Sequence, residues 1–141
     1  MVQEIINVVK RGTRGKEPLN IEKIHDMVEY ACEDIKGVSS SQVEMQSGLQ
    51  FYDGMSTDEI QQILIKSAAD LISLENPNYQ YVAARLLLYS LRKQVIDKLW
   101  DHPHIYEHTK KCIEKGVYDP EILNLYDKKD FDRMENWFNH E

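Results

Sequence analysis

The chain has 141 residues, of which 42% are hydrophobic, and a formal net charge of −7. This length suits one domain with a real core and is short for two complete ones. The acidic balance argues against a nucleic-acid partner, which usually meets a basic protein face, whereas a mononucleotide needs only a few local cations. No apolar run approaches the roughly 20 residues of a membrane span.

The two cysteines, Cys32 and Cys112, are far apart and lack the spacing of metal ligands or of a redox pair. The first residues carry no basic segment followed by an apolar one, so we expect no secretion signal. Together these features predict a reduced, cytoplasmic chain without a disulfide and without a membrane partner.

A short β-hairpin is predicted at the start of the chain. Branched apolar residues between positions 5 and 9 favour a strand that ends at Lys10. Gly12 and Gly15 supply the reversal, and residues 16–19 form the returning strand.

Two helices are predicted next. Asn20 is a good N-cap for a first helix that ends near Gly37, with apolar residues at helical spacing. These are Ile21, Ile24, Met27, Val28, Ala31, Cys32 and Ile35. Ser39 and Gln42 have the spacing of a capping box for a second, shorter helix that runs toward Gln50.

A turn at residues 51–54 separates these helices from two longer ones. Ser56 and Glu59 form a second capping box, which opens a third helix with an apolar stripe at Ile60, Ile63, Leu64, Ala68, Leu71 and Ile72. Asn76-Pro77 marks the start of a fourth helix that runs to about Leu99. Because apolar residues nearly surround this fourth helix, we expect it at the centre of the bundle.

From residue 102 onward the pattern changes to short helices. They are predicted over residues 105–115, ending at Gly116, then over 120–126 and over 128–138. The fold class predicted is therefore mainly α with a small β flap (α+β): a four-helix bundle capped by a hairpin in residues 1–98, followed by short helices in residues 99–141.

A phosphate-binding pole can be assembled from separate parts of this fold. Phosphates favour Lys or Arg and the N–H groups of a helix start, which Lys10, Arg11, Lys93 and Thr57 could supply. A flat apolar slot for a purine could come from Val8, Leu19, Ile21 and Ile24, with Glu17 and Asn20 near the edge of the base. Taken singly, each residue has a simpler role as an exposed charge, a helix cap or a core residue.

Three segments carry a family resemblance when they are considered together. Val9-Lys10-Arg11 with residues 17–24, then residues 53–60, then residues 79–93 closely resemble the ATP-cone, the regulatory domain at the N-terminus of the class I ribonucleotide reductase large subunit. The resemblance covers about the first hundred residues, with a one-residue difference in the flap turn. Residues 102–141 also resemble the segment that comes after the cone in that subunit, most clearly at Gly116-Val117-Tyr118-Asp119 and Leu125-Tyr126.

The resemblance implies a ligand, and it implies which residues bind that ligand. ATP or dATP, with Mg, would act as an allosteric effector of deoxyribonucleotide synthesis, and the chain would carry no catalytic cofactor. The residues implied in nucleotide binding are Lys10, Arg11, Glu17, Pro18, Leu19, Asn20, Ile21, Glu22, Lys23, Thr57 and Lys93, with Val8, Ile24, Ile60 and Gln61 lining the base and ribose pocket. The implied partners are the rest of the large subunit and the small, radical-generating subunit.

Two positions depart from the family pattern. Members inhibited by dATP often carry His at the position of Gln61, and a second His is common at the position of Ser90. One hydrogen bond is worth about 0.5 to 1.5 kcal/mol net, so such a change can alter discrimination between ATP and dATP without abolishing binding. We therefore expect a weakened response to dATP.

The catalytic barrel of the family, with its redox cysteines, is not matched in these residues, so we expect this chain alone to be inactive as a reductase. It is either a fragment of the large subunit or one piece of a split one. The alternative function is a nucleotide-independent helical module that only binds a protein partner.

Three weaker patterns receive structural interpretations. His104 and His108 have the i, i+4 spacing of two metal ligands but are expected to be surface residues. Tyr79 and Tyr81 are expected to pack in the core. Cys32 and Cys112 are expected to be buried within helices.

Overall fold

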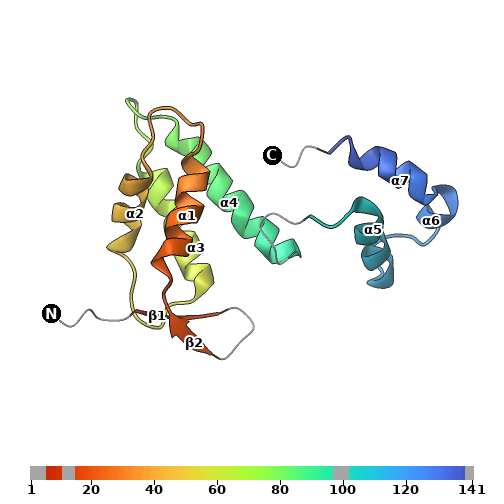
Figure 1. The fold of residues 1–141 in the computed structure, drawn as a ribbon, viewed down its shortest axis with the longest axis horizontal. Coiled ribbons are helices and arrows are strands. Elements are labelled where there is room, and N and C mark those ends of the chain that lie inside the picture. Colours follow the sequence, from red (N-terminus) through yellow and green to blue (C-terminus); the bar gives the residue numbers. More distant parts are fainter. Residues whose placement is uncertain (1–5, 11–14, 97–101, 139–141) are drawn as a thin grey trace. The chain divides into compact units, whose positions relative to one another are not determined.

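The computed structural model describes residues 6–10, 15–96 and 102–138, and the chain divides into two compact units, residues 1–95 and 96–141 (Figure 1). The described residues form seven helices and one two-stranded antiparallel sheet, which confirms the mainly helical α+β class. Among them, no helix combines the length and the apolar character that crossing a bilayer requires.

The predicted hairpin is confirmed. β1 (Asn7–Val9) pairs antiparallel with β2 (Lys16–Pro18), with Val8 opposite Glu17. One further hydrogen bond, from the N–H of Leu19 to the carbonyl of Ile6 at 2.8 Å, closes the open end of the ladder. The predicted reversal at residues 12–14 lies outside the described residues, as does Arg11.

α1 (Ile21–Cys32) begins as predicted and ends earlier than predicted. The side chain of Asn20 accepts from the N–H of Lys23 at 3.1 Å, which confirms the N-cap. The end near Gly37 was wrong, because the guanidinium of Arg85 in α4 takes the carbonyl oxygens of Ala31 and Glu33. A turn with Asp34 at φ 59° and Gly37 at φ 78° comes next.

α2 (Ser40–Gly48) is present, but its predicted capping box was wrong. Ser39 occupies the N-cap position without a side-chain cap, and the hydroxyl of Tyr79 in α4 takes the place expected for the Gln42 side chain at the N–H of Ser39. That oxygen accepts from the N–H of Ser39 at 3.0 Å, and the hydroxyl donates to the side-chain oxygen of Gln42. A side chain from α4 therefore defines the start of α2.

α3 (Thr57–Asp70) carries the second predicted capping box, which is confirmed. The hydroxyl of Ser56 accepts from the N–H of Glu59 at 3.2 Å, and the carboxylate of Glu59 accepts from the N–H of Ser56 at 2.7 Å. The helix buries Ile60, Gln61, Leu64, Ser67 and Ala68, and it packs against α2, which packs in turn against α1.

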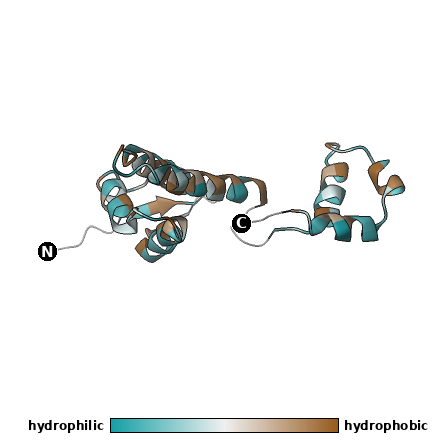
Figure 2. Cartoon of the chain, turned by 90° about the horizontal axis from the view of Figure 1, so that it is seen from above, coloured by the Kyte–Doolittle hydropathy of each residue, from teal (hydrophilic) through white to brown (hydrophobic). Residues whose placement is uncertain are grey.

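α4 (Tyr79–Ile96) is described up to Ile96, so its predicted continuation to Leu99 lies outside the described residues. It buries Tyr79, Val82, Leu86, Tyr89 and Ser90. The expectation that all its sides are covered was wrong: Leu87, Leu88 and Leu91 are about half exposed and Val95 is 72% exposed. The apolar colouring of α4 in Figure 2 therefore includes a face that no described part of its own unit covers.

Tyr79 and Tyr81 were both predicted to pack in the core, and the structure confirms this for only one of them. Tyr79 is 1% exposed, which confirms its burial, whereas Tyr81 is 55% exposed, so its burial was wrong. Two residues along a helix lie about 200° apart around the axis, and only Tyr79 shares the face of Val82 and Leu86.

The second unit contains three short helices, α5 (Ile105–Glu114), α6 (Ile122–Leu125) and α7 (Lys128–Glu135). α5 packs against α7 through an edge-to-face contact of the Tyr106 and Phe131 rings, whose centroids are 5.4 Å apart. Gly116, at φ 71°, ends α5 as predicted. Trp137 and Phe138 are exposed.

The two histidines and two cysteines considered above are all intermediate between buried and exposed. His104 contacts Asp132 at 3.2 Å, and His108 contacts the sulfur of Cys112 at 3.5 Å, along α5. The described residues contain no group of three or more side chains arranged to bind a metal ion. Cys32 and Cys112 are free thiols, each partly buried.

Candidate functional site

The end of β1 lies against the start of α3. The carbonyl of Asn7 accepts from the N–H of Gly54 at 2.8 Å, and the N–H of Val9 donates to the carbonyl of Met55 at 3.0 Å. Val9 and Ser56 form a parallel bridge, so the loop before α3 adds a third segment to the hairpin. Because parallel neighbours advance in the same direction, the next residues, Lys10 and Thr57, lie at the same end of this pairing.

Asp53 anchors this junction. Its carboxylate accepts from the N–H of Asn7 at 2.8 Å and from the side-chain amide of Asn7 at 3.0 Å. These hydrogen bonds from Asn7 lower the pKa of the Asp53 carboxyl below its ordinary value, and the charge of Lys16 adds to the effect. Gly54 comes next at φ 86°, in the left-handed region that favours glycine, so the chain can turn from β1 into α3.

One face of the hairpin carries a cation and an anion together. Val8 and Lys10 are two residues apart, and Glu17 is opposite Val8, so all three side chains lie on the same face of the sheet. Val8 is 4% exposed, whereas the side chains of Lys10 and Glu17 are about half exposed. The Lys10 ammonium and the Glu17 carboxylate are 2.9 Å apart.

The start of α1 continues directly from β2. Pro18 ends β2, Leu19 joins the ladder, and Asn20 caps the helix. The residues of the first helical turn, Ile21, Glu22 and Lys23, are exposed. The predicted segment from residue 17 to residue 23 is therefore continuous from β2 into α1, and Glu17 at its start contacts Lys10.

The predicted base-pocket residues lie beneath this strip, in the core. Val8, Ile24 and Ile60 are at most 8% exposed. Gln61, also 8% exposed, donates from its amide nitrogen to the sulfur of Met27 in α1 at 3.2 Å. Gln61 therefore links α3 to α1 one turn beyond Thr57.

Lys93 lies on the face of α4 that continues its buried side. Leu86 and Lys93 are seven residues apart, close to two helical turns, so they project in nearly the same direction. Leu86 is 1% exposed, whereas Lys93 is exposed near the C-terminal end of the helix. Lys93 therefore continues the face of Leu86 at the exposed end of the helix.

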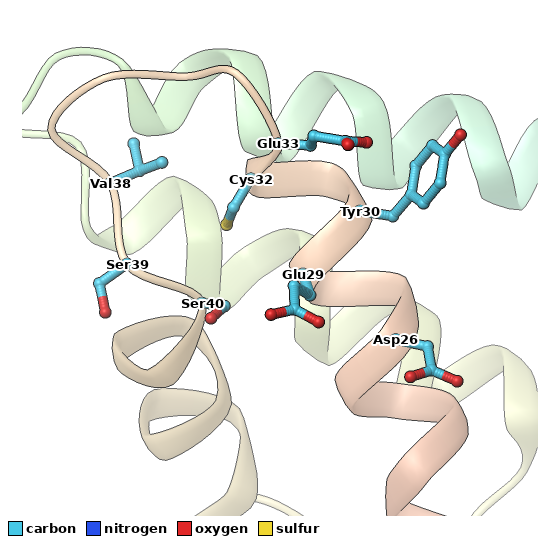
Figure 3. A pocket seen from close by; sticks show the side chains of 8 residues that line it. All are labelled: Asp26, Glu29, Tyr30, Cys32, Glu33, Val38, Ser39 and Ser40. Carbon is cyan, nitrogen blue, oxygen red and sulfur yellow. The ribbon is translucent and has the colours of Figure 1, made fainter.

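A hollow of about 730 Å³ lies elsewhere, between the second half of α1 and the loop that leads into α2 (Figure 3). It is open to solvent and lined by Asp26, Glu29, Tyr30, Cys32, Glu33, Val38, Ser39 and Ser40. Burial raises the pKa of the Cys32 thiol above its ordinary value. Three carboxylates line this hollow, and they repel a triphosphate, so we do not assign the anion site to it.

Asn7 and the tie that it forms with Asp53 were not among the predicted site residues. Residues 53–60 are among the segments that carry the family resemblance, but the sequence has no local pattern that links Asp53 to a residue 46 positions earlier. An Asn in a strand of branched apolar residues was the available sign, because Asn is depleted in strands unless its side chain has a partner.

Taken together, the geometry defines a class of protein: a small helical domain with a two-stranded hairpin that is joined to the start of α3 by a parallel bridge. The family model of the ATP cone domain matches residues 6–94. The chain belongs to the ATP cone domain family.

The curated relatives are much longer than this chain. It is 42% identical over 134 residues to ribonucleoside-diphosphate reductase 1 subunit alpha of Escherichia coli, a match that covers 95% of this chain and 18% of that protein. The corresponding subunit of Salmonella typhimurium is also 42% identical, with 95% and 17% covered. The alpha subunit of Enterobacteria phage T4 is 37% identical over 140 residues, with 98% and 18% covered. The chain spans under a fifth of the length of each of these relatives.

Proposed function

We propose that residues 1–98 form an ATP-cone regulatory domain, built as a four-helix bundle capped by the hairpin, that binds ATP or dATP with Mg. The bound nucleotide regulates ribonucleoside-diphosphate reductase in deoxyribonucleotide synthesis by changing how its subunits assemble. The observation that carries this proposal is the pairing of Val9 with Ser56, because it brings a strand-end lysine to the start of a capped helix.

The phosphates bind at this junction. Lys10 and Lys93, together with Arg11 next to Lys10 in the sequence, supply positive charge, and Thr57 supplies a hydroxyl at the helix start. The strip from Glu17 to Lys23 offers side-chain and backbone groups to the base and ribose, above the apolar floor of Val8, Ile24 and Ile60. Chain-wide acidity does not oppose this, because a mononucleotide needs only a few local cations.

Regulation requires that the nucleotide bind one assembly state of the reductase more tightly than the other, or that ATP and dATP differ in which state they favour. A coupling of about 1 to 3 kcal/mol between nucleotide and partner is typical of allosteric systems. The partners are the rest of the reductase large subunit and the small subunit, and residues 99–141 lead from the cone toward the catalytic part. This chain alone is not a reductase.

Thermal unfolding with ATP, dATP, GTP and no ligand tests the proposal. Ligands that bind only the folded chain raise its melting temperature, and the stabilisation grows with the logarithm of ligand concentration divided by Kd. Selective stabilisation by adenine nucleotides supports the proposal, and an unchanged melting temperature at millimolar ATP contradicts it.

The response to dATP is proposed to be weak. Members of the family that dATP inhibits often carry His at the position of Gln61, which here is hydrogen-bonded to Met27. A second common His is replaced by Ser90, which is 6% exposed. Calorimetric titration with ATP and dATP measures the preference. A strong preference for dATP together with formation of a larger assembly would contradict a weakened response.

A second candidate function rests on the exposed side of α4. Leu87, Leu88, Leu91 and Val95 form an apolar stripe on that helix, which suits a nucleotide-independent module that binds a protein partner. The two functions differ in their dependence on ATP, so the thermal unfolding series separates them.

A further inference from the structure

We propose that Glu17 occupies Lys10 in place of phosphate when no nucleotide is bound, and that this exchange of partners links phosphate binding to selection of the base. The inference rests on the proposed function, since it concerns regulation of the same site. It is carried by the 2.9 Å ion pair between two side chains that both lie on the site face of the hairpin.

The ion pair is easily exchanged. Both side chains are about half exposed, and exposed ion pairs contribute little to stability because water and salt screen them. A triphosphate carries several negative charges and strong acceptor oxygens, so it outcompetes one carboxylate for the Lys10 ammonium. The start of α3 at Thr57, beside the end of β1, favours an incoming phosphate in addition to Lys10, whereas Glu17 is held by the Lys10 ammonium.

Displaced from Lys10, the half-exposed Glu17 carboxylate can accept from water or from a donor on the ligand. An ionised carboxylate can only accept, and it lies near a bound polyanion that repels it. The 6-amino group of adenine is such a donor. A base with a carbonyl at that position presents a second acceptor to the carboxylate, which is unfavourable. Release of Glu17 therefore favours adenine once the phosphates are bound.

Glutamine at position 17 separates the two roles. A Gln side chain has no charge to hold Lys10, and its amide can both donate and accept. Glu17→Gln should therefore bind a phosphate chain more tightly than the wild-type chain does. It should also discriminate less between adenine and a base with a carbonyl group.

The experiment is isothermal titration of the 141-residue chain with three probes: inorganic tripolyphosphate, ATP and inosine triphosphate, which carries a carbonyl where adenine carries its amino group. Glu17→Gln is compared with the wild-type chain and with Glu75→Gln, which removes the same charge from an exposed loop residue. We expect Glu17→Gln to strengthen tripolyphosphate binding between about two- and fivefold, the range for loss of an exposed ion pair. The ratio of ATP to inosine triphosphate affinity should fall in Glu17→Gln alone.

The outcomes are distinguishable. If the wild-type chain binds ATP but Glu17→Gln leaves tripolyphosphate affinity unchanged or lower, the exchange is overturned and the proposed function stands. If Glu75→Gln strengthens tripolyphosphate binding equally, general repulsion explains the gain and the exchange is again overturned. If the wild-type chain binds none of the three probes, the proposed function fails with it.

Discussion

The carboxylate of Glu59 accepts from the backbone N–H of Ser56 at 2.7 Å, and it thereby fixes the residue that pairs with β1. Hydrogen bonds from Ser56 and Tyr52 also lower the pKa of Glu59 below its ordinary value of 4.5. The start of α3, where the proposed phosphate site lies, therefore depends on an ionised carboxylate.

The first prediction concerns pH. Because the pKa of Glu59 is lower in the folded chain, its ionised form stabilises the fold above pH 4.5, and this contribution is lost as the pH falls through the folded pKa. Urea unfolding between pH 7 and pH 3 should show that the free energy of unfolding falls less steeply with acid in Glu59→Gln than in the wild-type chain. The control Glu75→Gln should retain the wild-type slope; equal slopes in all three chains would contradict the role of Glu59.

The second prediction concerns the hydroxyl of Tyr79. Tyr79→Phe removes the acceptor for the N–H of Ser39 and the donor to Gln42, while the buried ring is kept. Leaving partly buried polar groups without a partner should lower the free energy of unfolding by about 1 to 3 kcal/mol. Chemical denaturation measures the loss. Tyr81→Phe is the matched control, because Tyr81 is 55% exposed, and a loss as large in that control would refute the argument.

A third prediction compares two leucines of one helix. Leu86 is 1% exposed and Leu88 is 47% exposed, so the same substitution tests two environments. Leu86→Ala should cost about 2 to 5 kcal/mol of unfolding free energy through lost burial and a cavity. Leu88→Ala should cost well under half of that. Equal losses would mean that the exposed stripe on α4 is covered in solution.

The fourth prediction concerns the two lysines of the proposed phosphate site. Lys10→Ala and Lys93→Ala should each abolish most of the rise in melting temperature that ATP produces, because each removes a positive charge from the triphosphate. Lys66→Ala is the control, since Lys66 is an exposed residue of α3 about two and a half turns beyond Thr57. Stabilisation by ATP that survives in both site variants would contradict the assignment of the phosphates to Lys10 and Lys93, whereas a wild-type chain that ATP does not stabilise would favour the nucleotide-independent function.

Local patterns in the sequence predicted the parts of this fold that depend on neighbouring residues. Asn20 and the Ser56–Glu59 box cap their helices through hydrogen bonds between residues three positions apart, so the sequence alone identifies them. Gly116 ends α5 for the same local reason. The hairpin was also predicted, because its two strands are close together along the chain.

Two of the errors involve a partner that is distant in sequence. Tyr79 takes the N–H of Ser39, expected to bond to Gln42, across 40 positions, and Arg85 takes the carbonyls at the end of α1 from more than 50 positions away. Apolar composition could not show that Leu88 is exposed and Leu86 buried, since burial depends on which helices pack against each side of α4. The candidate site was assembled from a family resemblance, and the structure adds the pairing that joins β1 to the start of α3.

Ser56 belongs to a strand pairing and to a helix at the same time, which makes the hairpin and α3 a single mechanical element. Through Ser56, a shift of β1 along its axis is coupled to the first turn of α3. The 14 residues of that helix form a rod about 21 Å long, so a small displacement at one end is delivered to the other with little loss. The two strands and α3 are thus joined at a single residue, Ser56.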